Sequence, residues 1–358
     1  MFGSRQALVA ETAPVPTSEP DEASPDLWQT LMNCYVALGS KRMVILRGVR
    51  DSDSAYLVQG IASLMAARPE EQCFMQAHPW WTAGTGAPGF WAMAHAQFNA
   101  LKLRDFIEMA TIHEAMARPF LICMERLSPA ELFCYFEHLP RGELWQPDGS
   151  TLPVRLPTNL YLVGTLGHSE YADALLDPAI YQYAAVISIP PVGEILWQRC
   201  KEMWPARHDG QRWLRSAVRT VEGAMRKLSR ILPKGTPPLA PLAEVASRLR
   251  LTRLPPWLLR DGWLYLSNAF DAFGAPLLVK DAMENLSLAQ DLFLAQTALP
   301  HLLTSGAGQV TAWVAVQKQL ARFPRAQALL ADLLTLHPNP TVKHPYVMNM
   351  CKEARVMA

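Results

Sequence analysis

Short, uniformly apolar segments alternate with helical segments along the first half of the chain. Apolar runs of about five residues without polar alternation are typical of strands in a parallel sheet that is covered on both faces. We expect such strands at residues 42–46, 72–77, 119–125, 160–164 and 185–189. Apolar residues at helical spacing predict helices at residues 27–38, 54–65, 90–117 and 129–138, with Gly39 ending the first of them. Strands that alternate with helices indicate an α/β core.

The strand pattern stops after Pro191, and helical spacing interrupted by prolines continues to the end of the chain. The second half is therefore predicted to be mainly α-helical. The pattern divides the chain into an acidic, proline-rich and disordered tail (1–25), an α/β core (26–192), a basic helical insertion (193–261) and a helical lid with the C-terminal region (262–358).

Composition narrows the class of protein. The chain has 358 residues, of which 50% are hydrophobic and 18% are charged. It contains no uncharged apolar run of the roughly 18 residues that a membrane-spanning helix needs, and no secretory signal pattern at its start. We therefore expect a cytoplasmic protein with no membrane partner. The six cysteines are scattered without metal-ligand spacing, so they are interpreted as reduced, mostly buried thiols, and no metal site is expected.

Charge is unevenly distributed along the chain. The total is +1, but residues 199–260 hold 14 Lys and Arg against 4 Asp and Glu, a local net charge of +10. Basic residues interleaved with tryptophans can contact nucleic acid through phosphates and stacked bases. The candidate contacts are Arg207, Arg212, Arg215, Arg219, Arg226 and Lys227. A solvated basic helix with tryptophans in the core, or a surface that docks an acidic partner such as the chain's own tail, explains the same pattern.

The segment after the first predicted strand occupies the position of a phosphate-binding loop. Such a loop reads G-x-x-x-x-G-K-[ST], because the second Gly lets the backbone wrap a phosphate, the Lys neutralises its charge and the hydroxyl binds Mg²⁺. This chain begins with Gly48 but has Asp53, Ser54 and Ala55 at those three positions. By itself the segment is typical of an ordinary strand-to-helix turn. A G-x-G-x-x-G match at residues 84–89 is weak, because Pro88 removes a backbone donor.

Taken together, these segments resemble the AAA+ ATPase module, and in particular the McrB-like branch, the motor subunit of modified-cytosine restriction systems. Residues 119–125 (PFLICME) are similar to its Walker B strand, and residues 156–165 (LPTNLYLVGT) to its sensor-1 strand. Residues 174–179 (ALLDPA) resemble the segment with the trans-acting arginine, and residues 289–302 (AQDLFLAQTALPHL) resemble the helical lid. The resemblance implies a P-loop NTPase-like (AAA+) parallel sheet sandwiched by helices and followed by a helical lid.

The departures from this family bear on activity. Besides the altered loop, Met124 replaces the Walker B aspartate, Gly167 the sensor-1 asparagine and Pro178 the arginine finger, while Glu125 remains at the position of the catalytic glutamate. These changes remove the charge, the Mg²⁺ ligands and the transition-state contact that phosphoryl transfer needs. The resemblance therefore implies a pseudo-ATPase rather than an enzyme, with no cofactor.

The expected role is that of an inactive subunit that scaffolds or regulates a larger assembly, in a DNA-processing or defence system. Its partners would be other protein subunits in a homo- or hetero-oligomer, with DNA as a further candidate partner. Two alternatives stay open. One is a nucleic-acid-binding module that uses the basic region 199–260. The other is a divergent motor that hydrolyses ATP or GTP with Mg²⁺, in which Arg50 or Lys41 replaces the loop lysine.

Overall fold

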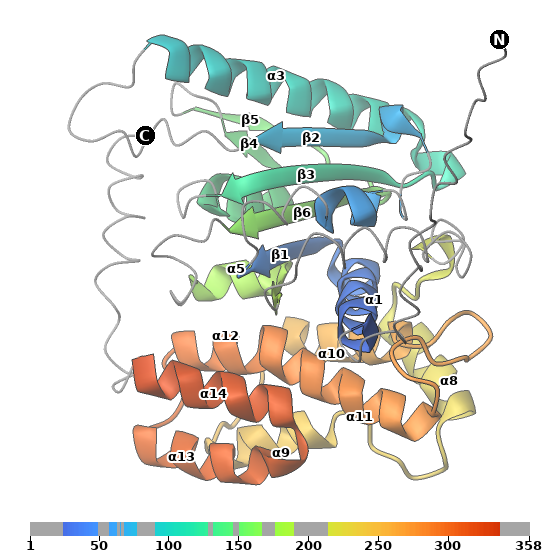
Figure 1. The fold of residues 1–358 in the computed structure, drawn as a ribbon, viewed down its shortest axis with the longest axis vertical. Helices are drawn as coiled ribbons and strands as arrows, with labels where there is room; N and C mark the ends of the chain where they lie inside the picture. Colours follow the sequence, from blue (N-terminus) through green and yellow to red (C-terminus); the bar gives the residue numbers. More distant parts are fainter. Residues whose placement is uncertain are drawn as a thin grey trace, which may run out of the picture.

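The computed structural model describes residues 24–48, 57–62, 65, 68–76, 90–127, 132–145, 150–166, 176–189 and 214–336. A five-stranded parallel sheet forms the upper part of the molecule in Figure 1, with α3 along its outer side. A set of helices that includes α9 to α14 forms the lower part. The predicted α/β class is confirmed, as is the helical second half within residues 214–336.

All five predicted strands are present and join into one sheet. They are β1 (Met43–Arg47), β2 (Gln72–Gln76), β3 (Phe120–Leu127), β6 (Leu160–Leu166) and β7 (Ala185–Ser188). Their spatial order is β2-β3-β6-β1-β7, and every neighbouring pair is parallel. The first strand therefore lies between the last two, an arrangement that differs from the 3-2-1-4-5-6 order of dinucleotide-binding folds and the 2-1-3-4-5 order of flavodoxin-like folds.

Helices connect the strands and form the second half. In the first half they are α1 (Ser24–Lys41), η1 (Pro69–Glu71), α3 (Phe90–Ile112), η2 (Glu114–Met116), η3 (Phe133–His138), η4 (Leu139–Arg141) and α5 (Pro178–Tyr183). In the second half they are α8 (Val221–Ile231), α9 (Ala240–Arg248), α10 (Pro256–Asn268), α11 (Ala282–Phe293), η5 (Leu294–Ala298), α12 (Leu299–Thr304), α13 (Val310–Gln319), η6 (Leu320–Arg322) and α14 (Pro324–Leu336). The domain boundary expected at residue 261 falls inside α10.

Side chains alternate between the two faces of the sheet, and each face is covered. Val44 and Leu46 belong to an apolar cluster that continues through α1 and the helices of the second half. Met43 and Ile45 belong to a second cluster, which includes residues from α3, the segment after β3, and α5. A strand buried on both faces needs apolar residues at every position, which is the pattern that the sequence shows.

Several boundaries differ from the predicted ones. α1 continues past Gly39 to Lys41 and ends where Arg42 takes a left-handed φ of 66°. The carbonyl oxygen of Gly39 accepts hydrogen bonds from Arg219 (2.7 Å) and Asn268 (3.3 Å), two residues that are distant in the sequence. α3 ends at Ile112, before the expected residue 117, and the short helix η2 follows it.

Two further elements were not expected in their observed form. The helix that follows β3 is a π-helix over residues 133–138 rather than an α-helix. An antiparallel hairpin of β4 (Glu143–Trp145) and β5 (Thr151–Pro153) comes before β6 and is not part of the main sheet. With only three residues in each strand, its apolar alternation is too short to be distinguished from a loop in the sequence.

A buried ion pair joins the sheet half to the helical half. The ammonium group of Lys41, at the end of α1, lies 2.7 Å from a carboxylate oxygen of Asp261 in α10, and the two side chains are 4% and 1% exposed. Lys41 also donates to the carbonyl oxygen of Tyr181 in α5 (2.6 Å) and lies 4.8 Å from the ring centre of Trp257. Burial lowers the pKa of Lys41, while the neighbouring Asp261 carboxylate raises it.

Two more polar contacts reinforce this junction. Arg219, which precedes α8, donates to the hydroxyl of Tyr161 in β6 (2.6 Å) as well as to Gly39. Asn268, at the end of α10, accepts a hydrogen bond from the backbone N–H of Val218 (2.8 Å) and is fully buried. Polar groups of the chain itself therefore join the two halves in addition to the apolar cluster that they share.

We predict that Asp261→Asn destabilises the fold by about 3–5 kcal/mol, because it leaves the Lys41 ammonium group buried without its counter-charge. Urea unfolding at neutral pH measures this free energy. The double variant Lys41→Met/Asp261→Leu should lose less stability than Asp261→Asn, since no uncompensated charge remains. Glu244→Gln, which breaks the exposed pair with Arg322, should change it by less than about 1 kcal/mol. Equal losses in Asp261→Asn and Glu244→Gln would contradict this role.

Candidate functional site

The candidate site lies along the carboxyl ends of the strands, where open parallel sheets bind ligands. Gly48, the first residue of the predicted loop, directly follows β1. Its φ is +79°, and a Cβ at this position would lie 3.0 Å from the carbonyl oxygen of Ile189, so both the backbone conformation and the close contact favour glycine. The other predicted loop positions, Asp53, Ser54 and Ala55, lie outside the described residues.

Met124 lies in the apolar core. It is 1% exposed, sits opposite Gly164 of β6 and belongs to the cluster that includes residues of α3. Gly164 has no room for a side chain, because an added Cβ would lie 2.3 Å from Leu127 and 2.8 Å from the ring of Phe136. A thioether in this setting packs against apolar neighbours and offers no oxygen ligand to Mg²⁺.

Glu125 lies beside an irregularity in β3. The register between β3 and β6 shifts between Met124 and Leu127, and Arg126 takes a φ of +59°. The backbone N–H of Arg126 donates to the hydroxyl of Thr165 in β6 (3.0 Å), which holds the bulge in place. Glu125 is half-buried and pairs with Gln76 of β2. Glu125 therefore lies directly before the point where the pairing of β3 with β6 becomes irregular.

Pro178 begins a helix. It is the first residue of α5, where a missing N–H costs nothing, and the carboxylate of Asp177 caps the helix by accepting from the N–H of Ala179 (2.8 Å). The carbonyl oxygen of Pro178 lies 3.2 Å from Nδ1 of His301 in α12. Pro178 thus connects the two halves of the molecule. Gly167, the other position identified from the resemblance, lies outside the described residues.

The strand order separates these positions. Gly48 and Glu125 are at the same edge of the sheet, but β6 lies between β1 and β3, so two strand spacings, about 10 Å, separate their strands. The described residues therefore bring Gly48 and Glu125 to one edge, without direct contact between their strands.

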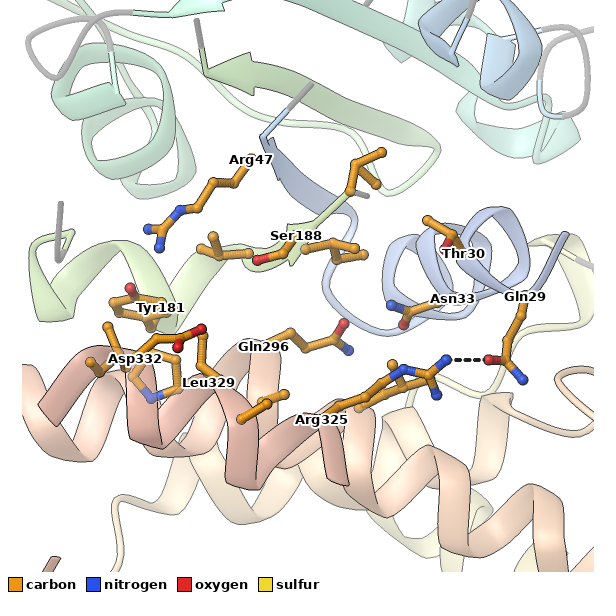
Figure 2. Close-up of a pocket in the computed structure, with 18 residues that line it drawn as sticks. Gln29, Thr30, Asn33, Arg47, Tyr181, Ser188, Gln296, Arg325, Leu329 and Asp332 are labelled. Atoms are coloured by element: carbon orange, nitrogen blue, oxygen red, sulfur yellow. Dashed lines mark hydrogen bonds between the residues drawn. The ribbon is translucent and has the colours of Figure 1, made fainter. Parts of the chain in front are cut away.

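A cavity of about 450 Å³ opens at the carboxyl ends of β1 and β7. Figure 2 shows Arg47 and Ser188 on its sheet side, Asn33 on α1, and Gln296 and Arg325 on the helical side. Its volume is within the range of small-molecule sites. The sequence analysis identified none of these lining residues, because they come from five elements and share no motif.

Arg47 and Tyr181 meet in this cavity. Burial raises the pKa of Tyr181, while the charge of Arg47 and a hydrogen bond from it act in the opposite direction. At the opening, a guanidinium nitrogen of Arg325 donates to the side-chain oxygen of Gln29, the bond drawn as a dashed line in Figure 2. The cavity thus combines two guanidinium groups with a largely apolar wall.

The described candidate nucleic-acid contacts divide into two groups. Arg219 and Lys227 make hydrogen bonds within the molecule: Arg219, although exposed, donates to Gly39 and Tyr161, and Lys227 donates to the carbonyl oxygen of Phe270 (2.6 Å). Arg215 and Arg226 are exposed. Arg207 and Arg212 lie outside the described residues. Part of the positive charge that the sequence assigned to a binding surface is therefore used to hold the fold together.

The described residues also bear on metal binding, thiol chemistry and membrane insertion. They contain no group of three or more His, Cys, Asp or Glu side chains placed to hold a metal ion. Cys34, Cys73 and Cys123 are free and buried, in line with the prediction of reduced, mostly buried thiols, and burial raises the pKa of Cys34 to about 12. None of the helices in this part of the chain combines the length and apolar character needed to cross a membrane.

We predict that Lys227 makes stability depend on pH. Burial lowers its pKa from 10.5 to about 8, so between these values the unfolded chain binds more protons than the folded one, and stability rises with pH. Between pH 8 and pH 10.5, the free energy of unfolding of the wild type should rise by roughly 1–2 kcal/mol relative to that of Lys227→Met. This energy is smaller than the full pKa shift implies, because the side chain is partly accessible to solvent. Urea unfolding across this range measures the gain, with the exposed Lys234→Met as control. A constant difference between the wild type and Lys227→Met would contradict it.

Comparison of the sequence with protein-family models and with curated proteins finds no significant match. The fold that the structure shows is a parallel five-stranded α/β sheet with flanking helices. The chemistry of the site has to be argued from its residues.

Proposed function

We propose that the chain is a catalytically inactive AAA+-like subunit that scaffolds or regulates a larger assembly. The observation that carries this proposal is the burial of Met124. At the strand position that resembles the Walker B aspartate, the side chain is 1% exposed and part of an apolar cluster, so this position contributes no Mg²⁺ ligand. Phosphoryl transfer depends on the metal to neutralise charge that develops on the phosphate oxygens.

Glu125 does not compensate for this loss. A carboxylate can orient a water molecule for attack, but it cannot supply the positive charge that a polyphosphate requires. Pro178 likewise offers no charged group. It is the first residue of α5, and its carbonyl oxygen contacts His301. The proposal explains why residues at these positions serve the fold rather than a reaction.

A scaffolding role is supported by the junction between the two halves. Lys41, Asp261, Arg219 and Asn268 fix the helical half on the sheet half through buried or partly buried polar contacts. These contacts come from the chain alone, so the arrangement does not require a bound nucleotide to hold it. A subunit with a fixed shape suits an assembly in which other subunits bind to it. We infer that these partners are protein subunits, of a DNA-processing or defence system.

This proposal predicts no nucleotide turnover. The purified full-length chain, given ATP or GTP with and without Mg²⁺, should release no phosphate above the protein-free background, because the described site lacks the ligands and charges for the reaction. Phosphate release over several hours measures this. Glu125→Gln and Glu108→Gln, a matched exposed control on α3, should behave like the wild type. Mg²⁺-dependent turnover that Glu125→Gln abolishes and Glu108→Gln retains would establish the divergent-motor alternative, with ATP or GTP as cofactor.

Nucleic-acid binding is a second candidate function, favoured by the exposed positions of Arg215 and Arg226. Each phosphate contact releases about one counterion, so the loss of one contact should reduce the slope of log K against log salt by about one. We therefore predict that Arg215→Gln/Arg226→Gln weakens binding to single-stranded DNA and reduces the slope of log K against log salt by about 2. Fluorescence anisotropy measures both quantities, with the exposed Lys318→Gln as control. Binding that is independent of salt would eliminate this function.

A further inference from the structure

Phe273 presents an aromatic ring to solvent from the loop between α10 and α11. Its side chain is 85% exposed, more than any other large apolar side chain in the described part of the chain. Figure 1 shows this loop, in orange, beside α8. Single apolar residues at a surface are common and need no explanation by themselves. The turn around Phe273 and the charges next to it are what make this ring a candidate binding group.

The turn at residues 271–275, here called the Phe273 turn, is held by hydrogen bonds. The carboxylate of Asp271 accepts from the backbone N–H groups of Phe273 and Ala275, each at 2.8 Å. The N–H of Gly274 donates to the carbonyl oxygen of Asp271 (3.1 Å), and Gly274 takes a left-handed φ of +89°. A backbone that is ordered in advance loses little conformational entropy when a ligand binds. The ring of Phe273 is therefore carried on a preorganised support.

Helix α8 supports this turn from one side. The ammonium group of Lys227 donates to the carbonyl oxygen of Phe270 (2.6 Å), directly before the turn. A Cβ at Gly274 would lie 3.1 Å from a side-chain carbon of Ile231, so backbone and helix are in close contact there. Lys227 and Ile231 are four residues apart and lie on one face of the helix. The turn is thus fixed against the second half of α8.

Two exposed arginines occupy the neighbouring ridge of the same helix. Arg226 and Arg230 each come one residue before a residue that supports the turn, about 100° around the helix from it. They are four residues apart, so their guanidinium groups share one face. Residues 215–234 contain six Lys and Arg against one Glu. The aromatic ring therefore stands beside a strip of positive charge.

We propose that the Phe273 turn and the arginine ridge of α8 bind single-stranded nucleic acid, with a base stacked on Phe273 and phosphates held by Arg226 and Arg230. Every base has a face that stacks on an aromatic ring, and basic side chains neutralise the backbone. The bases of a duplex are already stacked on one another, so the ring selects single strands. This inference rests on nucleic-acid binding, the second candidate function, and adds the residue that recognises bases.

The surroundings of the ring favour this ligand over an acidic protein. The core of a protein interface is depleted of charged residues and gathers several apolar ones. Here one ring stands next to a ridge of arginines, which matches a chain of alternating bases and phosphates.

The test uses the full-length chain and fluorescence anisotropy with three labelled probes. They are oligothymidylate, an abasic strand of equal length and a duplex of equal length. The abasic strand keeps the phosphates and removes the bases. We expect the wild type to bind oligothymidylate at least fivefold more tightly than the abasic strand, since stacking contributes in the first case alone.

Variants of Phe273 separate stacking from charge. Phe273→Ala should weaken oligothymidylate binding at least fivefold and leave binding of the abasic strand and of the duplex unchanged. The slope of log K against log salt should stay the same, because an uncharged ring releases no counterion. Phe273→Trp should retain the affinity, whereas Phe273→Leu should behave like Phe273→Ala, because leucine is apolar without an aromatic face. The exposed position implies unchanged melting temperatures in all three variants.

Two further variants provide the comparison. Arg230→Gln should reduce the salt slope by about one with every probe, because it removes a phosphate contact. Ile112→Ala on α3, a matched control whose side chain is 73% exposed, should bind all three probes like the wild type.

Three outcomes would overturn this inference. They are equal affinity of Phe273→Ala and the wild type for oligothymidylate, wild-type affinity in Phe273→Leu, and preferential binding of an acidic peptide of equal charge. If Arg215→Gln/Arg226→Gln lowers affinity and salt slope while Phe273→Ala has no effect, nucleic-acid binding stands and the stacking site fails. Binding of oligothymidylate that is independent of salt would remove both.

Discussion

The buried pair of Lys41 and Asp261 is the interaction on which the arrangement of this molecule depends. An ammonium group inside a protein is stable only with a counter-charge and acceptors around it. Lys41 finds these in α10 and at the end of α5, so the first helix, the last part of the sheet domain and the helical half meet at one nitrogen atom. The cavity at the carboxyl ends of β1 and β7 is bounded by residues of the same two halves.

The strands of the sheet could be predicted from the sequence, whereas much of the site could not. Val44 and Ile45 lie on opposite faces of β1 and both are apolar, and such an uninterrupted apolar run is visible directly in the sequence. The end of α1 is different, because Gly39 remains helical when Arg219 and Asn268, some 180 and 230 positions away, satisfy its carbonyl oxygen. Contacts over such distances leave no local pattern.

The same reasoning applies to the candidate site. Gly48, Met124 and Pro178 were identified through the resemblance, and their nucleotide-pocket role stays a prediction; the structure places them after β1, within β3 and at the start of α5. The cavity could not be predicted, because Arg47, Gln296 and Arg325 come together only through the packing of α14 and η5 against the sheet. A π-helical turn also has no distinct apolar period, so the position of Gln296 could not be predicted.

Gly164 is a position at which the fold tolerates few substitutions. A Cβ at this position would lie 2.3 Å from a methyl carbon of Leu127 and 2.8 Å from the ring of Phe136, so alanine would force these two side chains to move. We therefore expect distant relatives of this protein to keep this glycine together with the two large apolar residues that enclose it.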